Sequence, residues 1–172
     1  VDGGLLQAGH PELIFELDGQ AVTQPKHWHE VTNWSGTHAW YVGQAVALRE
    51  MSWQRVNAKS PTENQINRWA ALLWVIRAGE KYDAREFSPT AENFERIQKY
   101  WDQYARQIAE AKVGWEGLEV SNFVSKLATT STDFRDTSIA QPLQARRAER
   151  LVLALDRLAT ALPELDRNEP VQ

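Results

Sequence analysis

Apolar side chains recur every three or four residues along most of this chain, which is the spacing of one face of an α-helix. The pattern predicts five helices, of which the fourth is short. They span residues near 36–57, 61–78, 89–112, 117–129 and 138–162. Short connections make the first three helices antiparallel neighbours, and we expect a mainly α fold, an irregular antiparallel bundle of four to five helices.

The range 36–57 carries a wide apolar face. Its central stripe consists of Val42, Val46, Trp53 and Val56, with Tyr41, Ala45 and Leu48 beside it. Arg49 falls within this face by spacing. Its guanidinium either reaches solvent along an extended stem or pairs with a carboxylate of another helix, and we favour the first arrangement.

The range 61–78 has clear signals at both ends. Ser60 is the predicted N-cap, Pro61 follows at the first helical position, Glu63 closes a capping box, and Gly79 ends the helix. Apolar residues cover nearly the whole circumference between them, which predicts a central helix with neighbours on several sides.

The ranges 89–112 and 138–162 each carry a heptad-like apolar face. The first consists of Phe94, Ile97, Trp101, Tyr104, Ile108 and Ala111, and the second of Leu151, Leu155, Leu158 and Leu162. Such faces predict helix crossing angles near about +20°. Pro142 fits the last helix only within its first turn.

The N-terminal part of the chain has a different pattern. Residues 12–23 predict a short β-hairpin, because Asp18-Gly19 separates two short runs of strand-forming residues and favours a type I′ turn. The glycine-containing range 1–11 predicts a flexible leader or linker, and 164–172 a polar tail. The length of 172 residues indicates a single domain, which we place at 12–163.

Composition and charge exclude several classes of site and function. The net charge of −4 disfavours generic nucleic-acid binding. The absence of cysteine excludes disulfides, thiol nucleophiles and cysteine-ligated metals. The longest apolar run, residues 69–76, is far shorter than the roughly 20 residues of a transmembrane helix. The chain opens at Val1 without a signal peptide, which favours an extracytoplasmic domain, periplasmic or membrane-tethered.

The chain contains an unusual number of tryptophans, 8 in total. Spacing assigns Trp53, Trp69, Trp74 and Trp101 to the core. Another group lies near the ends of the predicted elements, with three tryptophans at six-residue intervals and a nearby histidine. We consider it a candidate partner-binding surface, because aromatic anchors dominate binding hot spots. Its members are Trp28, Trp34, Trp40 and His38. The alternative is that they cover one end of the bundle.

Histidines form the one cluster of metal-capable side chains. His27, His29 and His38, with Glu30, could surround a metal only if 27–29 is extended, because alternate residues share a face on a strand and diverge on a helix. No spaced metal-binding motif accompanies them. We therefore predict no metal and no other cofactor.

The last helix also carries a basic stripe. Arg146, Arg150 and Arg157 share a face and could bind an anionic lipid, a phosphate or an acidic partner. Glu149 and Asp156 are interleaved with them, so the interpretation we favour is a solvated, ion-paired face.

The sequence contains no nucleophile elbow, phosphate-cradling glycine loop or dinucleotide fingerprint, which favours a protein without enzymatic activity. We expect a protein–protein interaction or structural accessory module with a protein partner, such as the soluble domain of a membrane-tethered subunit in a bacterial or phage assembly. The alternative is a sensor or carrier domain that encloses a small apolar or aromatic ligand within the helical bundle.

Overall fold

The structure is a computed structural model that describes residues 36–57, 62–80, 91–111 and 117–161. The helices in these ranges are α3 (Gly36–Asn57), α4 (Glu63–Glu80), α5 (Ala91–Ala109), α6 (Leu118–Ala128), the 3-10 helix η2 (Thr129–Arg135) and α7 (Gln141–Ala161). The described ranges contain no strand, and the mainly α prediction is confirmed. The predicted leader, hairpin and polar tail lie outside the described residues.

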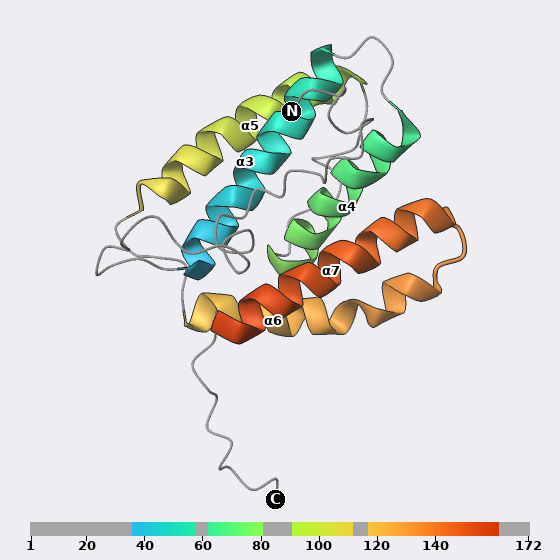
Figure 1. The fold of residues 1–172 in the computed structure, drawn as a ribbon. Helices are drawn as coiled ribbons and strands as arrows, with labels where there is room; N and C mark the ends of the chain where they lie inside the picture. Colours follow the sequence, from blue (N-terminus) through green and yellow to red (C-terminus); the bar gives the residue numbers. More distant parts are fainter. Residues whose placement is uncertain (1–35, 58–61, 81–90, 112–116, 162–172) are drawn as a thin grey trace, which may run out of the picture.

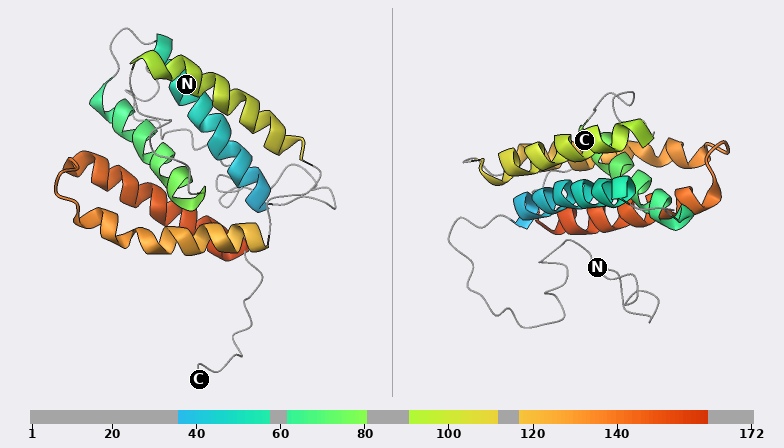
Figure 2. Two further views of the ribbon diagram at one scale, coloured as in Figure 1. Left: turned by 180° about the vertical axis from the view of Figure 1, so that it is seen from behind. Right: turned by 90° about the horizontal axis from the view of Figure 1, so that it is seen from above.

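The helices form two antiparallel pairs with α4 between them (Figure 1). α3 packs on α5, and α7 returns alongside α6 and η2. α4 contacts α3 on one side and both α6 and α7 on the other, as expected for a helix that is apolar nearly all round. α4 and α7 run in the same general direction, so the bundle is not antiparallel throughout (Figures 1 and 2).

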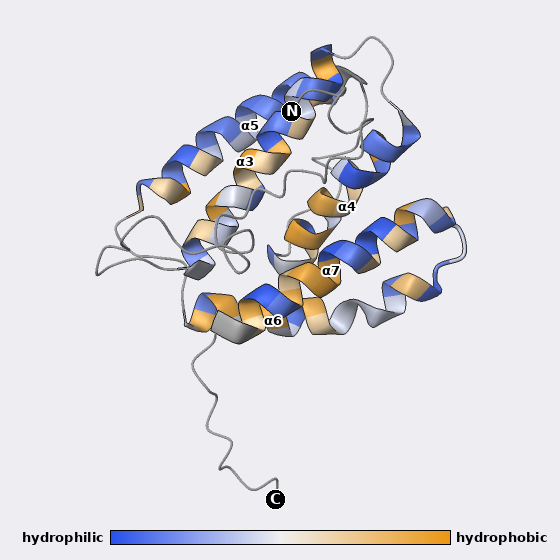
Figure 3. Cartoon of the chain, in the orientation of Figure 1, coloured by the Kyte–Doolittle hydropathy of each residue, from blue (hydrophilic) through white to orange (hydrophobic). Residues whose placement is uncertain are grey.

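One hydrophobic core runs through the five α-helices of the described ranges. Its largest fully buried side chains are Trp69, Trp101, Leu48, Leu72, Ile76, Ile97, Leu127 and Leu158. In Figure 3 the outward side of α5 is largely hydrophilic, and the hydrophobic part of α4 lies toward α6 and α7. The predicted apolar faces of α5 and α7 thus supply part of the core, although α5 packs mainly on α3 and α7 on α4.

The buried face of α3 is rotated from the predicted stripe. Val42 and Val46 are half-buried, and Trp53 and Val56 are exposed. The assignment of Trp53 to the core is therefore wrong. The face that packs inward includes three polar residues, Thr37, Gln44 and Ser52, which a pattern based on hydrophobicity places outside. The residues buried on α3 are Thr37, Trp40, Tyr41, Gln44, Ala45, Ala47, Leu48 and Ser52.

Arg49 adopts the arrangement that we did not favour. Its Nη1 atom lies 3.2 Å from a carboxylate oxygen of Asp102 on α5, and its Nη2 atom lies 2.7 Å from the Glu50 carboxylate. The guanidinium is partly exposed and joins α3 to α5 at the edge of the core. Such a pair is worth little in stability but fixes the polar border of the helix pair.

The first turn of α4 has a capping box two residues beyond the predicted one. The backbone N–H of Gln65 donates to Thr62 Oγ1 at 3.3 Å, and the N–H of Thr62 donates to Gln65 Oε1 at 2.9 Å. Thr62 is therefore the N-cap of a helix that begins at Glu63. Ser60 and Pro61 lie outside the described residues.

Gly79 does not end α4, which continues to Glu80. It is buried, and a Cβ atom at this position would overlap the ring of Phe123 on α6. The residue is small because α4 and α6 approach closely here. The remaining helix ends lie within about three residues of the predicted ones, and most of the connection between the predicted ranges 117–129 and 138–162 forms η2.

Candidate functional site

The predicted aromatic surface is only partly covered by the structure. Trp28, Trp34, His27 and His29 lie outside the described residues. Trp40 is 4% exposed and packs edge-on against Phe123 of α6, with ring centroids 5.9 Å apart. The placement of Trp40 off the core is therefore wrong: it fills the space between α3 and α6 and cannot anchor a partner in this conformation.

His38 is half-buried in the first turn of α3. Within the described ranges, no group of three histidine, aspartate or glutamate side chains could hold a metal ion. Because two of the three candidate histidines lie outside these ranges, the absence of a metal stays a prediction. None of the described helices combines the length and hydropathy needed to cross a bilayer.

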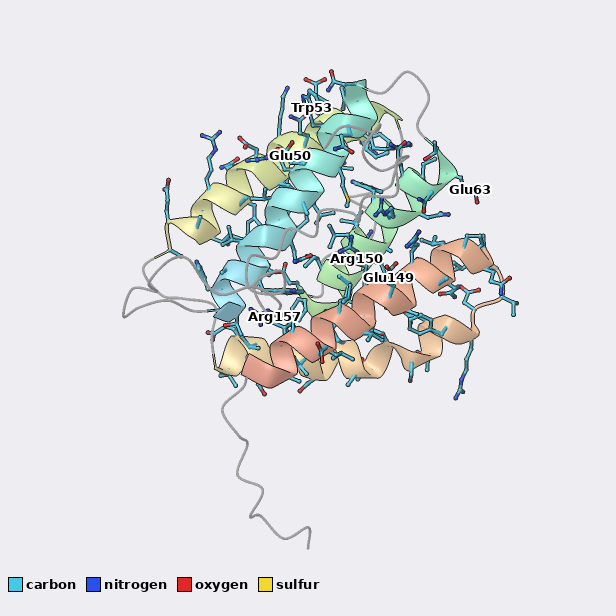
Figure 4. All side chains as sticks on the ribbon, viewed as in Figure 1. Glu50, Trp53, Glu63, Glu149, Arg150 and Arg157 are labelled. Carbon is cyan, nitrogen blue, oxygen red and sulfur yellow. The ribbon has the colours of Figure 1, made fainter. Side chains whose placement is uncertain are left out.

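Trp53 is the exposed tryptophan of the described part of the chain. Its side chain is 49% exposed, and that of Val56, on the same face one turn later, is 45% exposed. Glu50 lies one turn earlier on this face and pairs with Arg49 (Figure 4). We call Trp53 and Val56 the α3 apolar patch. An apolar centre beside charged side chains is the usual composition of a protein-binding surface.

The basic stripe of α7 lies on a helix that packs on α4. Arg146 contacts α4 through Asn64, and the charges of Arg146 and Arg150 act on a third arginine, Arg68 of α4. We call Arg68, Arg146 and Arg150 the α4–α7 arginine cluster. Arg157 lies further along α7 and is not among the charges that act on Arg68 (Figure 4). A role for Arg146, Arg150 and Arg157 in binding an anion or an acidic partner stays a prediction.

Two hydrogen-bonding contacts hold Arg146 in place. Arg146 donates from Nη2 to the Asn64 side-chain oxygen at 3.0 Å and pairs through Nη1 with Glu149 at 2.7 Å. Burial lowers the pKa of the Arg68 guanidinium, and the positive charges of Arg146 and Arg150 lower this pKa further. Glu149 raises it. The charges of Arg146, Arg150 and Glu149 on α7 thus all act on Arg68 of α4.

Arg147, the neighbour of Arg146, has a different environment. Its guanidinium lies over the ring of Trp74, 5.3 Å from the centroid. Burial lowers the pKa of Arg147, whereas Asp133 and Asp136 raise it. Trp74 also donates from Nε1 to Asp133 at 3.0 Å. These contacts join α4, η2 and α7 and have a structural role.

Arg68 is not among the candidate site residues that the sequence pattern predicts. The available signal was a charged residue directly before the long apolar run of α4, one turn after Asn64. Which helix this arginine faces depends on the packing of α4 on α7, and that cannot be derived from a single-helix pattern.

Comparisons with protein-family models, curated protein sequences and solved structures find no match to this chain.

Proposed function

We propose that this chain is a non-enzymatic protein–protein interaction module and that its partner binds at the α3 apolar patch. The observation that carries the proposal is the exposure of Trp53 at 49%, in contrast to the buried tryptophans of α3, α4 and α5. Trp is among the residue types most enriched in binding hot spots. Single exposed apolar residues are common, but here a tryptophan and a valine adjoin on one helix face.

The surroundings of the patch support a protein partner. Arg49, Glu50 and Asp102 form a charged border on the side toward α5. A desolvated apolar centre with a polar rim matches the anatomy of protein interfaces. α7 also exposes Val152 and Leu153, but aliphatic residues of these types are under-represented in hot spots, so we place the anchor at Trp53.

Site-specific photo-crosslinking in cells of the source organism tests the proposal. A photoreactive phenylalanine analogue replaces Val56 in one version of the chain and the exposed Gln103 of α5 in a control version. We expect a discrete crosslinked protein from position 56 only, and its loss when Trp53→Ser is added. Crosslinks that persist in Trp53→Ser, or the same pattern from both positions, would contradict the proposal, as would no crosslink at either.

The ligand-carrier alternative stays a prediction. Titration of tryptophan fluorescence with small aromatic ligands tests it, because Trp69 and Trp101 lie in the core that such a ligand would enter.

A further inference from the structure

We propose that the partner of the α3 apolar patch presents an arginine, whose guanidinium stacks on the exposed indole of Trp53 and pairs with the Glu50 carboxylate. The inference rests on the proposed function and names the chemistry of the partner, which is a basic segment of a protein. The guanidinium would lie across two side chains that are one helical turn apart on the same face of α3 (Figure 4).

The ring of Trp53 differs from the other described indoles in having no aromatic partner. The other tryptophans of the described ranges each pair edge-on with another ring, and they are Trp40, Trp69, Trp74 and Trp101. Within the same ranges Trp53 takes part in no aromatic or cation–π pair, and its side chain is 49% exposed. The face of an indole attracts a cation more strongly than a phenyl or phenol ring does. An exposed indole is therefore suited to a cationic side chain.

Glu50 supplies a negative charge beside this ring. Its Oε1 atom accepts a hydrogen bond from Arg49 Nε at 2.8 Å and lies 2.7 Å from Arg49 Nη2. In the described part of the chain its second oxygen, Oε2, has no hydrogen bond or ion pair. The Nη1 atom of Arg49 is directed to Asp102 of α5, at 3.2 Å, so this guanidinium does not cover the Trp53 ring. Glu50 thus keeps one acceptor oxygen for a cation from outside.

Trp74 shows in the same chain how an indole, an arginine and a carboxylate combine. The Arg147 guanidinium lies over the Trp74 ring, 5.3 Å from its centroid. Asp133 accepts a hydrogen bond from Trp74 Nε1 at 3.0 Å, and its charge raises the pKa of Arg147. Trp53 and Glu50 supply the indole and the carboxylate of such a group at the surface. The missing part is an arginine, because a planar guanidinium stacks on an aromatic face better than an ammonium group does.

The charge of the whole chain favours the same partner. Its net charge is −4, so the chain attracts a basic segment and repels an acidic one. Arginine is also enriched in interface cores and in binding hot spots, as tryptophan is. We therefore expect binding of the partner to weaken as salt is added.

The first experiment uses two capped tripeptides as probes, glycine–arginine–glycine and the same peptide with citrulline, which is uncharged and similar in shape. The indole N–H signal of Trp53, assigned with Trp53→Phe, is followed by NMR as each peptide is added. The titration is done on the unchanged chain, on Glu50→Gln and on a control, Glu110→Gln. The control removes an exposed carboxylate just beyond the end of α5.

We expect the arginine peptide to shift this signal in the unchanged chain and in Glu110→Gln, and the citrulline peptide to change it little. Glu50→Gln should bind the arginine peptide about two- to fivefold more weakly, as for the loss of an exposed ion pair. Equal shifts from the two peptides, no shift from either, or the same affinity in Glu50→Gln would overturn the inference.

Photo-crosslinking from position 56 separates this inference from the proposed function. We expect the yield of crosslinked protein to fall in Glu50→Gln but not in Glu110→Gln, and the crosslinked segment of the partner to contain an arginine. A crosslink that is lost in Trp53→Ser but unchanged in Glu50→Gln would support the proposed function and overturn the pairing with an arginine. No crosslink from position 56 would contradict both.

Discussion

Ser52 is a buried polar residue that joins α3 to α4. Its hydroxyl accepts a hydrogen bond from Trp69 Nε1 at 2.9 Å and donates to the Leu48 carbonyl at 2.7 Å. The Ser52 hydroxyl thus accepts one hydrogen bond and donates another inside the core, which explains how a serine can be fully buried. Hydrophobic periodicity gives no weight to such a residue, and this is why the predicted stripe of α3 was rotated.

We predict that Ser52→Ala lowers the free energy of unfolding by about 1–3 kcal/mol, because the indole N–H of Trp69 loses its acceptor inside the core. Urea unfolding measures the change through the midpoint at constant m-value. In a Trp69→Phe background the donor is absent, so Ser52→Ala should cost clearly less there. The same cost in both backgrounds would show that the hydrogen bond does not carry the effect.

Gly79 gives a second prediction at this scale. Alanine normally stabilises a helix interior by about 1 kcal/mol relative to glycine. Here the added Cβ overlaps the Phe123 ring, which is held by Trp40 and Tyr41, so Gly79→Ala should destabilise the protein by about 1–3 kcal/mol. Thermal unfolding checks the sign. Phe123→Leu should relieve the overlap, and if Gly79→Ala is equally costly in that background, the steric explanation fails.

At the scale of the helix, the capping box of α4 was predicted from the sequence, but at the wrong residues. Ser60-Pro61-Thr62-Glu63 and Thr62-Glu63-Asn64-Gln65 both fit the pattern of a hydroxyl residue followed three positions later by Glu or Gln. Sequence alone does not choose between overlapping matches. The reciprocal bonds between Thr62 and Gln65 decide it.

We predict that Thr62→Ala destabilises the protein by about 1 kcal/mol, because the N–H of Gln65 loses its side-chain acceptor at a helix start. Thr62→Ser keeps the hydroxyl and serves as the matched control, with little change expected. Chemical unfolding of both variants measures the difference. A loss of stability in Ser60→Ala with none in Thr62→Ala would instead show that Ser60 is the N-cap, as the sequence predicts.

Strong amphipathic patterns gave most helix positions correctly. Gly36–Asn57 coincides with the predicted range, and Phe94, Ile97 and Trp101 of α5 are buried as the heptad predicts. The candidate site residues were harder to predict from the pattern of single helices. Arg146 and Arg150 were found from their spacing, but Arg68 joins them through contact between helices distant in sequence. Exposure of Trp53 likewise depends on which side of α3 meets its neighbours.

For the whole molecule, the position of α4 determines how the two helix pairs are coupled. α4 contacts α3 as well as α6 and α7, and its Leu72 and Ile76 belong to the same core cluster as Leu158 of α7. A contiguous cluster of buried side chains favours cooperative unfolding over independent opening of each pair. The domain should therefore unfold as one cooperative unit, although its helices form two separate pairs with α4 between them.

Phe94→Ala tests this coupling from the α3–α5 end. Phe94 packs on Trp69 of α4, with ring centroids 5.1 Å apart, so its truncation should cost about 3–5 kcal/mol. If unfolding is cooperative, the slowest-exchanging amides of α7, near Ala154 and Leu158, should lose the same free energy of opening in native-state hydrogen exchange. Val152→Ala, an exposed change on α7 itself, should leave these amides nearly unaffected. Protection lost only in α3 and α5 would instead mean that α6 and α7 unfold separately, and that α4 does not couple the two pairs.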